Sequence, residues 1–147
     1  MIIAIGSDHA GFSLKEKIKE HLISKGYEVI DFGTNSPDST HYPLFARDVC
    51  LAVQRRQAQR GILVCGTGVG MCITANKFKG IRAALCLNEY MARMSRRHND
   101  ANVLCLGERV VGVELALSIV DVWLSEEFEG GRHEKRVMLI KEIEDMV

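Results

Sequence analysis

One glycine-rich segment has the composition of an anion-binding loop. The segment GTGVG (residues 66–70) follows an apolar run that ends at Cys65. Glycines let backbone amides point into a concavity, and a following helix adds the positive end of its dipole. Such a loop binds a phosphate, or an oxyanion formed during a reaction. The alternative is a tight strand-to-helix turn without a ligand.

Cys65 stands at the mouth of this loop. A thiol beside a helix N-terminus and several amides has its thiolate favoured, so it can act as a base or a nucleophile. The other four cysteines lack such a neighbour, and we interpret them as core residues: Cys50, Cys72, Cys86 and Cys105. Dinucleotide binding is disfavoured, because the loop follows the third strand and no acidic ribose ligand stands about 20 residues further on.

Two histidines are candidates for acid–base chemistry. His9 comes directly after Asp8 at the end of the first apolar run, and His98 precedes Asn99 in a basic segment. A histidine beside a carboxylate suits proton transfer near neutral pH. The three remaining histidines are interpreted as ordinary surface or core groups: His21, His41 and His133.

Arg132 and Arg136 are four residues apart. On a helix their guanidinium groups project from the same face, where they can clamp one phosphate or simply form a solvated basic face. No His, Cys or carboxylate cluster has metal-ligand spacing, so we expect no metal ion.

Short β-branched runs alternate with helical periods and must position these residues. Strands are predicted over residues 1–5, 27–32, 61–65, 81–86 and 103–106. Such an alternation indicates βαβ units and a parallel sheet covered on both faces. We therefore expect one α/β domain over residues 1–147, a Rossmann-like three-layer αβα sandwich with a five-stranded parallel sheet.

Helix signals lie between these strands. Ser13 and Glu16 have the spacing of a capping box, and Pro43 predicts the start of a helix that runs to about Gln59. A third helix is expected from the glycine loop through Asn76, and Asn88 can cap a fourth that runs to about Arg97. An apolar stripe over 113–124 predicts a fifth helix, and the last helix is expected to bury Val137, Ile140 and Ile143.

Ligands of parallel sheets bind at the carboxyl ends of the strands. Asp8 and His9 follow the first strand, and Cys65 ends the third. We expect these residues and the segment from His98 to Asp100 to converge on one edge of the sheet.

Composition excludes several classes of protein. The 147 residues carry 19 basic and 19 acidic side chains, with a pI near 7.0, which argues against a general nucleic-acid binder. No run approaches the ~20 apolar residues that span a bilayer, so no membrane association is expected. Five cysteines without disulfide-like spacing indicate reduced thiols and a cytoplasmic location.

Long motifs of the chain resemble the B-type ribose-5-phosphate isomerases. They are GSDHAGFSLK, the YP at 42–43, ILVCGTGVGMCITANKFKGIRAA, SRRHNDANVLCLGERVVG and EGGRHEKRV, and together they cover essentially the whole chain. The family also includes allose-6-phosphate isomerases and subunits of galactose-6-phosphate isomerase. The resemblance implies an aldose–ketose isomerase that interconverts ribose 5-phosphate and ribulose 5-phosphate without a cofactor.

The resemblance also implies roles for individual residues. Cys65 would be the base that moves a proton between C2 and C1 through an enediolate. His98, with Asp8 near the ring, would open the furanose, and Thr67 would assist proton exchange between O1 and O2. The remaining substrate contacts would be His9, Gly66, Gly68, Val69, Gly70, Asn99, Arg109, Arg132 and Arg136.

Members of the family work as homodimers or dimers of dimers with sites at the subunit interface. We therefore expect the His98–Asn99 segment to reach a neighbour's Cys65. Some relatives use a glutamate just after the glycine loop, where this chain has Met71, so only the thiol is available here. Two alternatives stay open: a hexose-6-phosphate isomerase for allose or galactose phosphate, and a non-catalytic sugar-phosphate-binding module.

Overall fold

Five parallel strands form the centre of the molecule in a computed structural model that describes all 147 residues. The strands are β1 (Ile2–Ser7), β2 (Glu28–Asp31), β3 (Arg60–Cys65), β4 (Ala83–Leu85) and β5 (Val103–Gly107), in the spatial order β2-β1-β3-β5-β4. The predicted five-stranded parallel sheet is confirmed, although β4 is shorter than expected.

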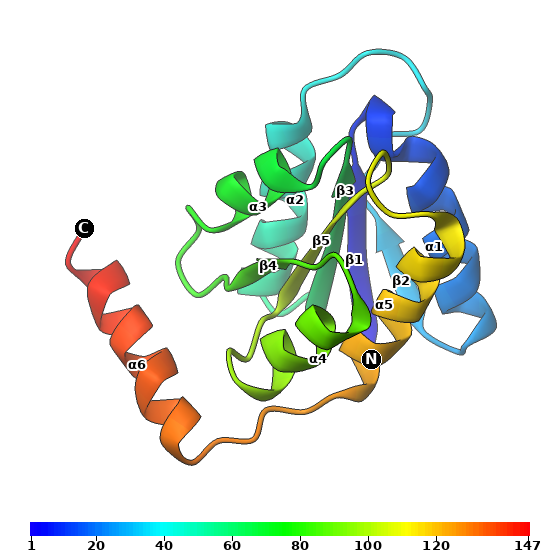
Figure 1. The fold of residues 1–147 in the computed structure, drawn as a ribbon. Coiled ribbons are helices and arrows are strands. Elements are labelled where there is room, and N and C mark those ends of the chain that lie inside the picture. Colours follow the sequence, from blue (N-terminus) through cyan, green and yellow to red (C-terminus); the bar gives the residue numbers. More distant parts are fainter.

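Six α-helices connect or follow the strands, together with a 3₁₀ turn at His9–Gly11. The helices are α1 (Phe12–Ser24), α2 (Tyr42–Gln54), α3 (Val69–Ala75), α4 (Glu89–Arg97), α5 (Val113–Ser125) and α6 (Arg132–Asp145). Figure 1 shows α1, α4 and α5 on one face of the sheet and α2 and α3 on the other. This is the expected three-layer αβα arrangement.

Two apolar clusters hold the layers together. One joins side chains of α1, α4 and α5 to one face of the sheet and includes the fully buried Trp123. The other joins α2 and α3 to the opposite face and includes Cys50, Cys65 and Cys105. Alternate residues of each strand supply the two clusters, as the period of two along a strand requires.

Two predictions about helix starts have different outcomes. Asn88 caps α4 as expected, its Oδ1 accepting a hydrogen bond from the Met91 amide at 2.8 Å. The capping box at Ser13 is wrong, because α1 already begins at Phe12 and no side chain of its own N-cap closes it. Instead Glu108, from the far end of the chain, accepts a 2.6 Å hydrogen bond from the Leu14 amide.

The last helix differs most from expectation. Val137, Ile140 and Ile143 were expected on a buried side of α6, but Ile140 is 49% exposed and Ile143 is 63% exposed. Figure 1 shows α6 standing apart from the three layers at the end of an extended connection. The period of the apolar residues is helical, yet within one chain little of the body covers them.

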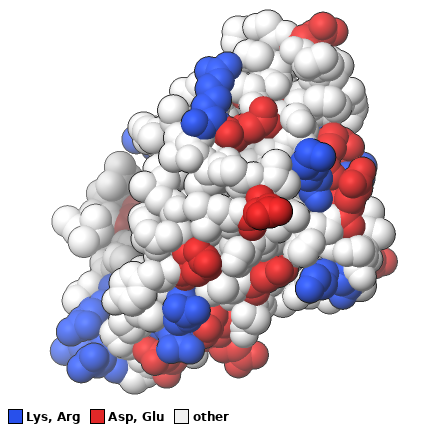
Figure 2. All heavy atoms as spheres, turned by 45° about the vertical axis from the view of Figure 1, so that its right-hand side comes forward, with Lys and Arg blue, Asp and Glu red and all other residues white.

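Charge is distributed without a dominant sign on the face that Figure 2 shows. Basic and acidic side chains are interspersed there among neutral groups. One charged group is fully buried: Lys15, whose ammonium group donates to Asp31 at 2.8 Å and to the Thr34 carbonyl at 2.7 Å. No helix is both long and apolar enough to cross a bilayer.

Candidate active site

A cavity of about 490 Å³ lies at the carboxyl edge of the sheet, where the predicted loop follows β3. Eight of the thirteen predicted site residues line it: Asp8, His9, Cys65, Gly66, Thr67, Val69, Gly70 and Arg109. Gly68 lies within the same loop. The structure therefore brings together the segments after β1, β3 and β5, as the parallel topology requires.

Cys65 opens onto this cavity from the end of the central strand β3. It is the last residue of β3, and its sulfur receives a 3.1 Å hydrogen bond from the Gly68 amide. An amide aimed at a sulfur stabilises negative charge on it. The thiol is only 5% exposed, so it is withdrawn from bulk solvent but opens onto the cavity.

The loop after Cys65 offers further amides. The backbone N–H groups of Gly66, Thr67 and Gly70 donate to no group of the chain, although these residues line the cavity. A buried or cleft-lining amide without a partner favours an acceptor supplied by a ligand. The loop therefore has amides that can donate to an oxyanion next to the Cys65 sulfur.

The loop depends on glycine at two positions. Gly68 has φ +82°, and a Cβ on it would lie 2.6 Å from Leu85 Cδ1 and 2.9 Å from the Leu106 carbonyl carbon. A Cβ on Gly70 would lie 2.6 Å from the ring of Tyr42. Any side chain here would push the loop away from β5 or from Tyr42.

Asp8 caps the 3₁₀ turn after β1, and His9 is its first residue. Asp8 is 6% exposed, and its Oδ1 accepts a hydrogen bond from the Gly11 amide at 3.1 Å. The Thr40 amide donates to His9 Nδ1 at 3.1 Å. A ring nitrogen that accepts must be unprotonated, so the other nitrogen, Nε2, carries the proton and is a donor.

Arg109 and Tyr42 reach the cavity from two further elements. Arg109 follows β5, its amide donates to the Gly66 carbonyl at 3.0 Å, and its side chain lies against Gly66. Tyr42, at the start of α2, also lines the cavity and was not among the predicted site residues. The sequence feature that could have indicated Tyr42 is its position beside Pro43, because the helix that begins there starts at the carboxyl edge of the sheet.

His98, Asn99, Arg132 and Arg136 do not line this cavity. The expectation that the 98–100 segment shares an edge with Cys65 is wrong within one chain. This segment precedes β5, whereas Cys65 ends β3, and in the parallel register Cys65 pairs with Gly107 at the opposite end of β5. The length of β5 from Val103 to Gly107 alone separates the two ends of the strand by about 13 Å.

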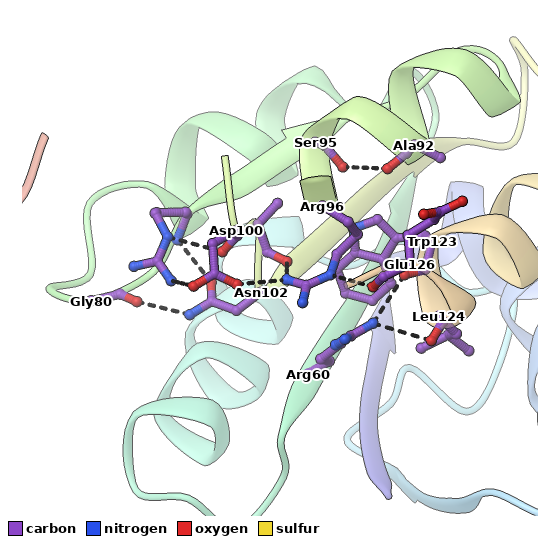
Figure 3. Close-up of polar contacts among 12 residues, drawn as sticks. Arg60, Gly80, Ala92, Ser95, Arg96, Asp100, Asn102, Trp123, Leu124 and Glu126 are labelled. Carbon is purple, nitrogen blue, oxygen red and sulfur yellow. Dashed lines mark hydrogen bonds and ion pairs between the residues drawn. The ribbon is translucent and has the colours of Figure 1, made fainter. Parts of the chain in front are cut away.

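A polar network fixes the 98–102 segment at the amino edge of the sheet (Figure 3). Arg96 donates to Asp100 at 3.0 Å and to the Ala101 carbonyl, and Arg82 donates to the Asp100 carbonyl at 2.9 Å. Because Arg96 is buried and its donors are paired, the segment after α4 is held rigidly.

His98 is one member of a second group of polar residues, which we call the α4–α6 cluster: His98, Glu129, Arg132, His133 and Arg136. The rings of His98 and His133 stack with centroids 4.0 Å apart. Glu129 Oε1 lies 3.3 Å from His98 Nε2 and 3.7 Å from His133 Nε2. Burial, His98 and Arg132 all lower the pKa of His133 below its usual 6.5.

Sequence reasoning missed two members of this cluster. Glu129 was not singled out, and His133 was interpreted as an ordinary structural group. The four-residue spacing of Glu129 and His133 was the available signal, but the third partner, His98, comes from another helix. Ligand atoms of His98, Glu129 and His133 all lie within 4.8 Å of one another, so these three residues have the donor set for a metal ion.

The comparisons with known proteins agree with one another. The family described as Ribose/Galactose Isomerase matches residues 3–140. The chain is 56% identical to ribose-5-phosphate isomerase B of Escherichia coli strain K12, over 97% of this chain and 95% of that protein.

Solved structures give the same result. A ribose-5-phosphate isomerase B structure from Clostridium thermocellum has a TM-score of 0.99 and 60% identity, covering 99% of both chains. The enzyme from Mycoplasma genitalium, solved with bound ribulose-5-phosphate, has a TM-score of 0.96 and 45% identity, covering 99% of this chain and 97% of its own. The chain therefore belongs to the Ribose/Galactose Isomerase family, as its motifs indicated.

Proposed function

We propose that this protein is a cofactor-free aldose–ketose isomerase that interconverts ribose 5-phosphate and ribulose 5-phosphate. The observation that carries the proposal is the Cys65 sulfur, which receives the Gly68 amide at 3.1 Å and opens onto a cavity with unpaired amides. The names of the relatives and the ribulose-5-phosphate bound to the Mycoplasma neighbour support the substrate class.

The proposed proton transfer needs only groups of the cavity. The Cys65 thiolate takes the proton from C2 of the open aldose, and the electron pair of that C–H bond forms the C1–C2 double bond of an enediolate. The amides of Gly66, Thr67 and Gly70 hold the negative charge that develops on O1. The Thr67 hydroxyl passes a proton from O2 to O1, and the Cys65 thiol then returns its proton to C1.

The phosphate and the closed sugar ring require groups that the cavity lacks. Within one chain it offers His9, a neutral donor through Nε2, and Arg109. We assign Arg132 and Arg136 to the phosphate and His98, with Asp8, to opening the furanose ring. Asp8 lines the cavity, whereas His98, Arg132 and Arg136 lie in the α4–α6 cluster at the other edge of the sheet, so a second copy of the chain supplies these three.

The surface of one chain supports such a homodimer. Val69 and Ile73 on the wall of the cavity are 46% and 59% exposed, and α6 exposes Met138, Leu139, Ile140 and Ile143. Exposed apolar groups on an extended arm and beside the cavity are typical of a surface that a second subunit covers. In a homodimer or a dimer of dimers, each cavity is completed by the α4–α6 cluster of a second copy, which gives one site per chain. Asn99, beside His98, contacts the sugar.

The cysteines favour a reducing compartment. All five are free. Burial raises the pKa of Cys50 to about 12 and that of Cys86 to about 11, and a hydrogen bond to Cys72, followed by burial, raises the pKa of Cys105. We place the protein in the cytoplasm on this ground.

Turnover by the purified chain tests the proposal directly. We expect ribose 5-phosphate to be converted without added metal or nucleotide, and allose 6-phosphate to be converted much more slowly. A preference for allose 6-phosphate would establish the hexose phosphate alternative. Tight binding of ribose 5-phosphate without any turnover would establish a binding module, and a requirement for a second, different chain would indicate the galactose type.

A further inference from the structure

Lys15 is a completely buried lysine in α1 that does not line the cavity. Its position is unfavourable for a cation in two respects. Burial removes the ammonium group from water, and the nearby N-terminus of the helix is the positive end of the dipole. An apolar side chain would fill the same space without either penalty. The reason for a lysine here must therefore lie in the groups that its ammonium contacts.

Three acceptors surround this ammonium group. It donates to both carboxylate oxygens of Asp31, at 2.8 and 2.9 Å, and to the Thr34 carbonyl at 2.7 Å, while Glu16 Oε1 lies 3.1 Å away. Asp31 is the last residue of β2, and it also accepts from the Gly33 amide at 2.8 Å. Lys15 therefore holds the chain on both sides of the point where it leaves β2.

The connection from β2 to α2, residues 32–41, is in turn attached to the end of β1. The Ser7 amide donates to the Gly33 carbonyl, and the Thr34 amide donates to the Ser7 carbonyl, both at 2.7 Å. Ser7 ends β1 and stands two residues before His9. Figure 1 shows this connection as an arch over the carboxyl ends of the strands. Its first residues are thus fixed beside the turn that carries His9.

The far end of the connection holds the His9 ring. The Thr40 amide donates to Nδ1 at 3.1 Å, so Nε2 carries the proton and can donate to a ligand in the cavity that His9 lines. Hydrogen bonds thus join Lys15 to His9 along two routes, one through Ser7 and one through the connection to Thr40.

We propose that Lys15 is a positioning residue of the active site: its buried ammonium group fixes residues 32–41 and thereby keeps the Nε2 N–H of His9 directed at the substrate. This inference rests on the proposed function, in which His9 contacts the sugar phosphate. Lys15 itself touches neither the substrate nor the reacting atoms, so its effect must pass through the His9 ring.

The state of the His9 ring tests this role without any turnover. Lys15→Met keeps an unbranched side chain but leaves the Thr34 carbonyl without its donor. We expect NMR spectra of the ring nitrogens at pH 8 to show both His9 tautomers in this variant and only the Nε2–H form in the wild type. Lys19→Met is the matched control, because Lys19 contacts Asp31 at 3.1 Å but not Thr34. It should keep the single form.

Kinetics test whether the ring position matters for the substrate. We expect Lys15→Met to raise KM for ribose 5-phosphate about tenfold and to change kcat less than about threefold, because His9 contacts the ground state and the transition state alike. In a His9→Ala background the same substitution should change KM by no more than about twofold, since its target is gone. Lys19→Met should keep the KM of the wild type. Effects of Lys15→Met and His9→Ala that simply multiply would overturn the proposal.

Folding and turnover are separated from the positioning role. If Lys15→Met does not fold, Lys15→Met combined with Asp31→Asn removes the ammonium group without leaving a buried carboxylate short of its partner. A single Nε2–H tautomer of His9 in the variant that lacks the ammonium group would overturn the proposal. A wild-type protein without turnover would contradict the proposed function, yet the His9 tautomer would still decide whether Lys15 orients the ring.

Discussion

Cys65 and His98 lie at opposite edges of the sheet. Cys65, the last residue of β3, pairs with Gly107 at the carboxyl end of β5. His98 comes before β5 in the chain and therefore lies near Val103, at the amino end of that strand. Both residues belong to the proposed reaction, which therefore requires two copies of the chain. We propose that each cavity receives the α4–α6 cluster of another copy.

Loss of the Cys65 sulfur should stop the reaction and spare binding. We expect Cys65→Ala to lower kcat by about 10³-fold, in the range that a positioned base contributes, with little change in the dissociation constant for ribose 5-phosphate. Calorimetry and an isomerase assay measure the two quantities. Cys72→Ala, on the neighbouring helix, is the control and should retain turnover. Substantial kcat in Cys65→Ala would assign the base to another group.

Gly68 tests whether the loop geometry matters for activity. Gly68→Ala would place a methyl group 2.6 Å from Leu85 at a φ of +82°, so we expect a loss of more than about 2 kcal/mol in the free energy of unfolding, together with a large loss of kcat. Gly26→Ala is the matched control: its φ is +91° but its Cβ meets nothing within 4 Å. It should lose only about 1–2 kcal/mol and keep full activity. Equal losses of activity in both variants would contradict a specific role of the loop geometry in the reaction.

The carboxyl-edge half of the site was predictable from sequence because it depends on local order. Parallel strands joined by helices place the residues after β1, β3 and β5 at one edge, so Asp8, Cys65 and Arg109 meet there whatever the details of packing. The position of His98 was predicted wrongly because it stands before a strand. A residue at the end of a helix that leads into a parallel strand lies at the amino edge.

Long-range contacts account for the other errors. Ser13 and Glu16 have the spacing of a capping box, but Glu108, 94 residues further along the chain, accepts from the Leu14 amide instead. Ile140 and Ile143 have the period of a buried helix face, yet periodicity does not say whether the same chain covers that face. Assembly of the α4–α6 cluster from two helices likewise has no local signal.

Arg136 should act on binding rather than on chemistry. Phosphate contacts are the same in the ground state and the transition state, so Arg136→Ala should raise KM about tenfold and leave kcat nearly unchanged. Steady-state kinetics with ribose 5-phosphate measure both constants. Lys135→Ala, the adjacent exposed residue of α6, is the control and should behave as the wild type. An unchanged KM in the Arg136 variant would exclude it from the phosphate site.

Cys72 should be the thiol whose reactivity follows pH near neutrality. A hydrogen bond from Cys105, with others from Leu85 and Asn76, lowers the pKa of Cys72 to about 7 despite partial burial. Its thiolate forms as the pH rises through 7 and is lost as the pH falls. Iodoacetamide labelling of Cys72, mapped by mass spectrometry, should rise about tenfold from pH 6 to pH 8 and then level off. Labelling that still rises steeply above pH 8 would contradict the lowered pKa.

The most direct test of the account uses two variants that are each defective. Cys65→Ala and His98→Asn chains, carrying different affinity tags, are co-expressed, and the mixed dimer is purified. In that dimer one site holds both substitutions and the other holds neither, so we predict about half of the wild-type turnover of ribose 5-phosphate. Turnover no higher than that of the parent variants would contradict the claim that two copies of the chain build each active site.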